Sequence, residues 1–357
     1  MSALDTERHV LFVHPFDALA GSQRVAVALI RAFYGLNCRV RVLLGFGTNG
    51  FVARLDGVRA FLSVNHVGLR KALYPLWLVM LMPRMLWAVW RREIVWANTI
   101  HAIPAVLLVL VLAPSRVVVH VHEIEFPRLF GWLLDWAVSR GATMLCVSDF
   151  QRRELGIRAG VLHNCVDKMG EALPSQPPVL LFVGAVSALK GFPLFIEVVS
   201  RLPPGMFTAV ACVPSLPDSA HEWIARAQHL GVILRCGLAD PEDIFAGATL
   251  LIQCTDPGIA TETFSLVMSE ALAFGVPVAT TGMGVASEVL AGAWAFDAPS
   301  REPDLVASKI VALCQDKPRL ASLRVAALER RMNFSFPVFQ VRVGDVLNEV
   351  MGKEACQ

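Results

Sequence analysis

The chain has 357 residues, of which 55% are hydrophobic, and this length exceeds what one hydrophobic core usually supports, so two domains are expected. The formal net charge of +2 is too small for the dense basic face of a nucleic-acid-binding protein. Eight cysteines occur without a C-x-x-C pair, which argues against a zinc site or a disulfide framework and suits a reducing cytoplasm. The first nine residues are polar and charged and lack the apolar core of a signal peptide.

The first half of the chain alternates short apolar runs, typical of buried strands, with helical patterns. Residues 21–33 carry apolar side chains at helical spacing, between predicted strands at 9–15 and 38–46. Further predicted strands span residues 93–99, 115–123, 143–149 and 158–167. Strands separated by helices indicate a parallel sheet that is covered on both faces.

Two apolar runs raise the question of membrane contact. Residues 103–114 are too short to span a bilayer, and we expect them to form a core helix. Residues 72–92 are interrupted by Pro83 and Arg84, so no spanning helix is predicted there. Two interpretations of residues 74–92 remain: a core helix, or a surface helix that dips into an anionic bilayer, because basic residues flank its tryptophans.

Residues 168–178 are rich in proline and polar side chains and are the best linker candidate. The strand pattern then restarts, with predicted strands at 178–185, 207–214, 232–237, 249–254 and 276–281. We therefore expect an α/β protein with two Rossmann-like domains, residues 1–167 and 179–335, whose parallel sheets face a central cleft. Residues 336–357 form a last helix, and its pattern leaves open whether it crosses back to the first domain.

Two carboxylates, Glu262 and Glu270, flank an apolar run that we expect to be helical from 263 to 274, which would place them about 12 Å apart along the axis. The start of such a helix exposes backbone N–H groups that attract anions, and carboxylates accept hydrogen bonds from hydroxyls. A nucleotide-sugar fits this pattern. From the spacing alone, two solvated acids are the simpler interpretation. The N–H groups concerned belong to Thr263, Phe264, Ser265 and Leu266.

The stretch ETFSLVMSEALAFGVPVATT, residues 262–281, resembles the E-x7-E segment of the retaining family 4 glycosyltransferases, which have the GT-B fold. It departs from the usual family form at Thr263 and Ser265. Other segments resemble the family in the same order, so the resemblance covers nearly the whole chain. These segments are GSQRVAVALIRAFYGLNCRVRVL, VVVHVHE, LCVSDFQRREL, HNCVD and FVGAVSALKGFPLFIEVVSRL.

The resemblance implies transfer of a sugar, with retention of configuration, from a nucleotide-sugar to a glycan acceptor. Residues 1–167 would form the acceptor side, and residues 179–335 would bind the donor. Catalytic roles fall to three residues: His122 contacts the sugar, Glu262 orients its hydroxyls, and Lys190 stabilises the leaving diphosphate. Glu270 would hold the ribose. The other donor-binding positions implied are Gly21, Ser22, Gly184, Thr263, Phe264, Ser265 and Leu266.

One departure concerns the phosphate-binding pair of the family, an arginine and a lysine. Lys190 stands at the lysine position, but Ala185 stands where the arginine belongs. The remaining histidines, His14 among them, are expected to be structural. No Asp-x-Asp or G-x-G-x-x-G motif occurs, so we expect neither a metal ion nor a cofactor.

The leading hypothesis is thus a glycosyltransferase of bacterial surface polysaccharide or lipopolysaccharide synthesis. It would be cytoplasmic, with peripheral contact to the inner face of the membrane through residues 74–92 left open. The alternatives are a sugar-nucleotide epimerase or phosphorylase of the same fold, or a non-catalytic protein that binds nucleotide-sugars.

Overall fold

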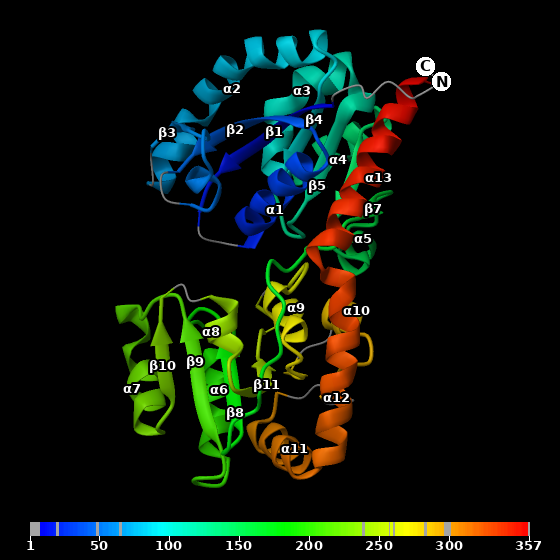
Figure 1. Cartoon of the computed structure of the whole chain (residues 1–357). Helices are drawn as coiled ribbons and strands as arrows, with labels where there is room; N and C mark the ends of the chain where they lie inside the picture. The colour runs from blue at the N-terminus through cyan, green and yellow to red at the C-terminus, as the bar shows by residue number, and fades with distance from the viewer. Residues whose placement is uncertain are drawn as a thin grey trace. The chain divides into compact units, whose positions relative to one another are not determined.

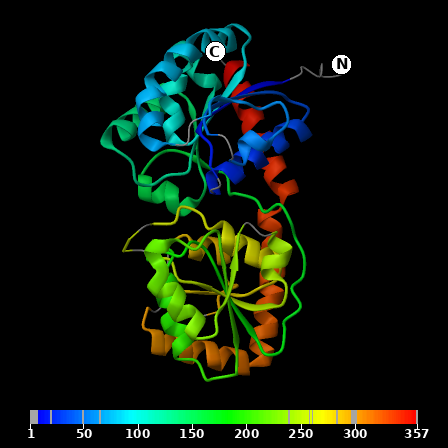
Figure 2. The same cartoon turned by 90° about the vertical axis from the view of Figure 1, so that its left-hand side faces the viewer.

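The computed structural model describes residues 8–18, 21–47, 50–63, 66–237, 240–256, 258–259, 261–281, 284–295 and 301–355. The chain divides into two compact units (Figures 1 and 2). Unit 1 comprises Met1–Cys165 and Phe336–Gln357, and unit 2 comprises Val166–Ser335. Each unit contains its own parallel sheet with helices, which confirms the expected α/β fold of two domains.

In the described residues, the sheet of unit 1 has seven strands in the order β3-β2-β1-β4-β5-β6-β7. Strand β3 was not predicted, because three residues are too few to show an alternating pattern. The strands are β1 (His9–Phe16), β2 (Arg39–Phe46), β3 (Ala60–Leu62), β4 (Ile94–Asn98), β5 (Val117–Val121), β6 (Thr143–Cys146) and β7 (Gly160–Val161).

Helices cover both faces of this sheet, because successive side chains of its buried strands point to opposite faces. In β1, Leu11 and Val13 belong to the core beneath α2, α3 and α4, whereas Val10 and Phe12 belong to the core beneath α1 and α13. The helices of unit 1 are α1 (Gly21–Gly35), α2 (Val67–Trp90), α3 (Ile103–Leu112), α4 (Arg128–Ser139), α5 (Asp149–Leu155) and α13 (Phe336–Ala355), with short 3-10 turns at Val52–Arg54, Ile100–Ala102 and Pro114–Arg116.

The last helix, α13, packs on unit 1 and so answers the question that its sequence pattern left open. Phe339, Val343 and Leu347 recur at helical spacing and are buried in the core that α13 shares with α1. Unit 1 is therefore built from both ends of the chain, and unit 2 from the segment between them.

The sheet of unit 2 has five strands among the described residues, in the order β10-β9-β8-β11-β12. Its strands are β8 (Val179–Val183), β9 (Thr208–Val213), β10 (Ile233–Cys236), β11 (Ala248–Gln253) and β12 (Val278–Thr280). Its helices are α6 (Phe192–Ser200), α7 (His221–His229), α8 (Pro241–Phe245), α9 (Leu266–Ala273), α10 (Ala286–Leu290), α11 (Pro303–Gln315) and α12 (Lys317–Arg330), with 3-10 turns at Asp218–Ala220 and Arg331–Phe334.

Residues 168–178, expected as a linker, belong instead to the body of unit 2. The backbone N–H groups of Gly170, Ala172 and Ser175 donate to carbonyl oxygens of this unit at 3.1, 2.8 and 3.1 Å. Proline and polar residues therefore mark a packed, extended segment here, because its peptide groups find partners in unit 2 rather than in water.

Candidate active site

In unit 2, a tight turn after β8 positions Lys190. Gly191 adopts a φ of 72°, and a Cβ atom there would lie 1.9 Å from the carbonyl oxygen of Cys254, so only glycine fits. The backbone N–H of Asp256 donates to the carbonyl of Leu189 at 3.0 Å. The turn is thereby held against the segment that follows β11. Gly184 and Ala185 lie at its start, and Ala185 is exposed.

Lys190 and Glu262 form an ion pair within a small polar cluster. The Lys190 Nζ atom donates to Oε1 of Glu262 at 2.6 Å, and the Thr255 hydroxyl donates to the same oxygen at 2.9 Å. The amide of Gln253 donates to Thr255 at 2.8 Å and approaches Glu262 at 3.4 Å. We call these four residues the Lys190 cluster. The hydrogen bonds that the other three residues donate to the Glu262 carboxylate are charge-assisted and hold this carboxylate in one orientation.

Gln253 and Thr255 were not predicted as site residues. Gln253 is the last residue of β11, and Thr255 follows two residues later. The signal that was available is their position, since ligands of parallel sheets bind at the carboxyl ends of the strands.

Helix α9 begins later than predicted, at Leu266 rather than at residue 263. Ser265 is extended, with a ψ of 103°, and its hydroxyl accepts a hydrogen bond from the N–H of Met268, so it is the N-cap. Thr263 and Phe264 therefore precede the helix. Because Glu262 lies outside α9, the expected separation of the two acids along one helix axis does not apply.

Neither acid is a solvated helix end. Glu262 is ion-paired, and its side chain is 16% exposed. Glu270 lies within α9 and is 4% exposed. Burial of a carboxylate is unfavourable without partners, so both positions call for a structural or binding role.

In unit 1, the amide of Asn98, the last residue of β4, bridges two histidines. Its nitrogen donates to Nδ1 of His14 at 3.1 Å, and its oxygen accepts from Nε2 of His122 at 2.9 Å. The Glu123 carboxylate accepts from the backbone N–H of His122 and of Ile100, each at 3.1 Å. His122 therefore presents one ring orientation. Asn98 and His14 were not predicted as site residues.

All three histidines of this region are held neutral at pH 7. Burial lowers the pKa of His14 to about 4 and that of His120 to about 3. Burial also lowers the pKa of His122 well below its usual value, and the neighbouring His120 and His14 lower it further. A neutral His122 can exchange hydrogen bonds with hydroxyls, but it carries no proton for general acid catalysis at this pH.

The segment LCVSDFQRREL supports the loop that carries Glu123. Ser148 caps α5 by accepting from the N–H of Gln151 at 3.0 Å. The buried Gln151 amide accepts from the N–H of Val147 and donates to the carbonyl of Glu123, both at 2.8 Å. Its role in the structure is to connect the ends of β5 and β6.

Gly21 and Ser22, predicted as donor-binding positions, are the first residues of helix α1 within the described residues. The Ser22 hydroxyl donates to the side chain of Gln23 at 3.0 Å, and Gln23 donates to the carbonyl of Phe16, the last residue of β1, at 2.9 Å. Residues 19 and 20, which precede the helix, lie outside the described residues. In unit 1, the predicted residues thus follow the ends of β1 and β5.

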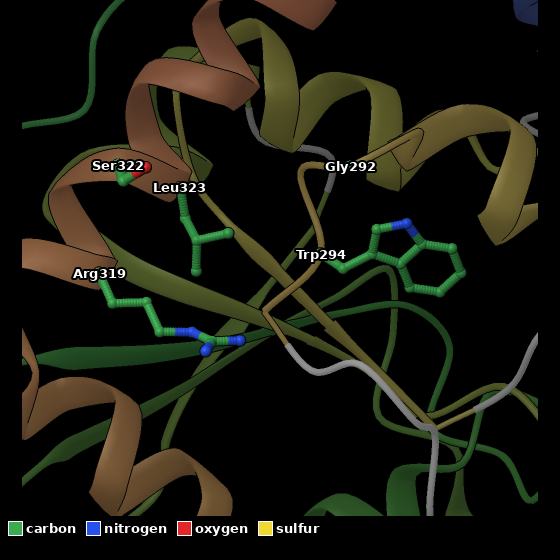
Figure 3. A pocket seen from close by; sticks show the side chains of 5 residues that line it. All are labelled: Gly292, Trp294, Arg319, Ser322 and Leu323. Carbon is green, nitrogen blue, oxygen red and sulfur yellow. The ribbon is translucent and has the colours of Figure 1, made fainter.

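A cavity of about 460 Å³ lies elsewhere in unit 2 (Figure 3). Arg319 and Leu323 extend from α12 toward the loop that carries Gly292 and Trp294. Trp294 pairs with Val278, the first residue of β12, so the cavity lies toward the amino end of that strand. It contains none of the predicted site residues, and we do not assign the donor to it.

Two family models match the chain, one in each half. Residues 19–168 match the model described as Glycosyltransferase Family 4, and residues 177–316 match the model described as Glycosyl transferases group 1. A search of curated proteins found no match.

Solved structures show similarity over nearly the full length. HepE from Anabaena, in complex with UDP and glucose, is 18% identical with a TM-score of 0.71, over 96% of this chain and 100% of that one. Sucrose-phosphate synthase from Thermosynechococcus elongatus is 14% identical with a TM-score of 0.78, over 97% and 100%. The lipopolysaccharide outer core galactosyltransferase WaaB is 14% identical with a TM-score of 0.67, over 97% and 99%. At these identities the likeness concerns the fold.

Proposed function

Since the chain is a glycosyltransferase of the GT-B type, composed of a family 4 domain and a group 1 domain, we propose that it transfers a sugar from a nucleotide-sugar to a glycan acceptor with retention of configuration. The observation that carries this proposal is the Lys190 cluster, which lies where β8 and β11 end in the group 1 domain. It combines a cation for a diphosphate with a carboxylate for sugar hydroxyls.

The chemistry of the cluster suits a donor with both kinds of group. A lysine ammonium has three N–H donors, so Lys190 can keep its bond to Glu262 and still donate to diphosphate oxygens as negative charge develops on the leaving group. All the described bonds to Glu262 end on Oε1, and Oε2 is the oxygen that we assign to the sugar hydroxyls.

In the family 4 domain, His122 is the residue that we assign to the transferred sugar. Its Nε2 atom is bonded to Asn98, and the ring is neutral, so it acts as a hydrogen-bonding group rather than as a general acid. Because burial keeps its pKa well below the usual value, the neutral ring is also a weak base, and the acceptor hydroxyl gives its proton to the leaving diphosphate on the same face of the sugar. Departure and attack on one face produce retention.

We further propose that the acceptor is a growing surface glycan and that catalysis needs no metal ion. The name of one structural neighbour, a lipopolysaccharide outer core galactosyltransferase, supports this class of acceptor. HepE was solved with UDP and glucose and supports a nucleotide-sugar donor.

A donor screen by saturation-transfer NMR tests the proposal. Purified protein is mixed with UDP-, GDP- and TDP-sugars, with and without EDTA, and transfer is read on the sugar and ribose protons. We expect one donor to bind regardless of EDTA. Glu270→Gln and Lys190→Gln should each weaken binding at least tenfold, since each removes a charged hydrogen-bonding partner of the donor.

Glu197→Gln is the matched control. Glu197 is an acid of the same unit that lies on α6 and pairs with Arg226 of α7 at 2.5 Å. This variant should bind the donor as the wild type does. Absence of binding to any nucleotide-sugar would refute the assignment. Retention is tested separately by the anomer that is first released when the bound donor is hydrolysed, and release of the opposite anomer would refute it.

A second candidate, a non-catalytic nucleotide-sugar-binding protein, is favoured by Ala185. This exposed residue follows Gly184 at the start of the Lys190 turn and leaves the turn without an arginine there. Ala185→Arg should raise the rate of donor turnover if the protein is an enzyme with a single phosphate-binding cation, by about tenfold or more. If Ala185→Arg binds the donor more tightly but neither it nor the wild type turns the donor over, the protein is a binding protein.

A further inference from the structure

Helix α2 of unit 1 exposes an unusual amount of apolar surface. It runs without a break from Val67 to Trp90, so the predicted interruption at Pro83 does not end it. Within the described part of the chain, its segment Gly68–Trp90 alone is long and apolar enough to cross a membrane, yet only 22% of its most apolar window is buried. A core helix would be mostly buried.

The helix has two apolar faces with different partners. On one face, Trp77, Leu81 and Met85 are almost fully buried in the core of unit 1, where α2 packs along α3. Around the rest of the helix, eight apolar side chains are between 45% and 69% exposed, and we call them the α2 apolar face. They are Leu69, Leu76, Val79, Met80, Met82, Leu86, Trp87 and Trp90.

This geometry favours a helix that lies in the plane of a membrane rather than one that crosses it. Spanning a bilayer would pull Trp77, Leu81 and Met85 out of the protein core, with loss of their packing. An in-plane orientation leaves those contacts intact and buries only the α2 apolar face in lipid.

The charges around the helix identify the kind of surface that it fits. Residues 67–92 include no acidic residue, and they include five basic ones: Arg70, Lys71, Arg84, Arg91 and Arg92. The next acid, Glu93, is buried and paired with Arg41 at 2.6 Å. Such a segment is attracted to acidic lipid headgroups.

The end of α2 has the composition of an interfacial anchor. The centroids of the Trp87 and Trp90 rings lie 4.9 Å apart. The two residues are 49% and 69% exposed, and Arg91 follows Trp90 directly. Tryptophan prefers the headgroup level of a bilayer. Tyr74, by contrast, is not part of the α2 apolar face, because its hydroxyl donates to the carbonyl of His101 at 2.6 Å and its ring stacks on Phe16.

We propose that the α2 apolar face docks this protein in the plane of an anionic lipid bilayer. Trp87 and Trp90 enter at headgroup level, and Arg84 and Arg91 contact the acidic headgroups. Docking of this kind would bring unit 1 to acceptors that are carried on lipid.

Cosedimentation with vesicles tests the proposal. The full chain is mixed with vesicles of phosphatidylcholine alone or of an equimolar mixture with phosphatidylglycerol. We expect binding to the mixed vesicles only, weakened by high salt. Trp87→Ser/Trp90→Ser should reduce partitioning by at least about tenfold, because two large side chains no longer leave water. Arg84→Gln/Arg91→Gln should reduce binding to mixed vesicles in particular.

Two controls keep the outcome specific to this face. Tyr34→Ser removes an exposed aromatic from α1, on the opposite face of the sheet, and Arg158→Gln/Lys317→Gln removes two exposed charges that do not belong to α2. Neither should alter partitioning. The tryptophan variant should still bind the nucleotide-sugar, so the two proposals fail independently.

Equal vesicle binding by the wild type and the tryptophan variant would overturn the proposal, as would no binding to either lipid mixture. Sedimentation velocity without lipid tests the other partner that this face could bind, a second copy of the chain. A wild-type dimer that the tryptophan variant converts to a monomer, with no vesicle binding, would make this face an interface between copies of the chain.

Discussion

At the scale of single residues, Gly191 and Gly205 allow two costs of replacing a glycine to be measured separately: the strain of a left-handed backbone and the steric clash of an added Cβ atom. Both have φ near 72°, but only at Gly191 would a Cβ collide with another part of the chain. Gly205→Ala should lower the free energy of unfolding by about 1 kcal/mol, the cost of a left-handed alanine. Gly191→Ala should lower it by about 3 kcal/mol or more.

Urea unfolding of the two variants measures this difference. Because Gly191 holds the turn that carries Lys190 against Cys254, its variant should also bind the donor less tightly, while Gly205→Ala should not. Equal losses of stability would show that the turn moves to admit a methyl group.

His120 makes the stability of unit 1 sensitive to pH. Its native pKa of about 3 lies below that of the unfolded chain, about 6.5, because the ring is buried. As the pH falls through this range, the unfolded state takes up a proton that the native state does not, so stability decreases. Leucine does not titrate, so His120→Leu should remove this contribution to the pH dependence. Between pH 7 and pH 4.5, the free energy of unfolding of the variant should fall by about 2 kcal/mol less than that of the wild type.

Urea unfolding at both pH values tests this expectation, with His229→Gln, an exposed histidine of unit 2, as the control. The control should lose as much stability as the wild type between pH 7 and pH 4.5. The same loss in His120→Leu would mean that groups other than His120 cause the acid sensitivity.

At the scale of elements, the start of α9 joins stability to donor binding. Ser265 caps the helix, and removal of a serine cap costs about 1 kcal/mol. Ser265→Ala should therefore lower the stability of unit 2 by about this amount and weaken donor binding, because the N–H groups of the first turn lose their fixed direction.

Ser308→Ala is the matched control, since that serine lies inside α11 and donates to the carbonyl of Leu305 without capping a helix. It should change neither quantity by much. If Ser265→Ala destabilises the protein but binds the donor normally, α9 is a structural helix and the diphosphate lies elsewhere.

At the scale of the whole molecule, the chain connectivity predicts which unit a core mutation loosens. Val343 of α13 and Val306 of α11 are both fully buried, but they belong to different units. Val343→Ala should cost about 2 kcal/mol and reduce hydrogen-exchange protection in β1 and α1. Val306→Ala should instead reduce hydrogen-exchange protection in β8 and β9. Loss of protection throughout the chain in both variants would show that the units unfold as one.

Much of the architecture could be predicted, because buried parallel strands and amphipathic helices leave local periodic patterns. Most strands appeared as apolar runs, and residues 21–33 showed the helical spacing of α1. The start of α9 was predicted too early, because a serine can continue a helix or cap it, and the local pattern does not distinguish the two.

The candidate site was predictable only in part. Glu262, Lys190 and His122 stand in motifs, and a motif names a residue without its partners. Their partners come from other parts of the chain, and no motif marks them; for Gln253 and Thr255 the only local signal is their position at the carboxyl end of a strand. These partners are Gln253, Thr255, Asn98 and, through Asn98, His14.

The sequence by itself therefore determined the α/β class, the two-domain organisation and the candidate residues, since each rests on local spacing or on a motif. Only the tertiary structure decided that α13 belongs to unit 1, that residues 168–178 belong to unit 2, and that α2 has a second apolar face exposed to solvent. Those outcomes depend on contacts between residues far apart in the chain. A run of apolar residues does not by itself specify which other segment packs against it.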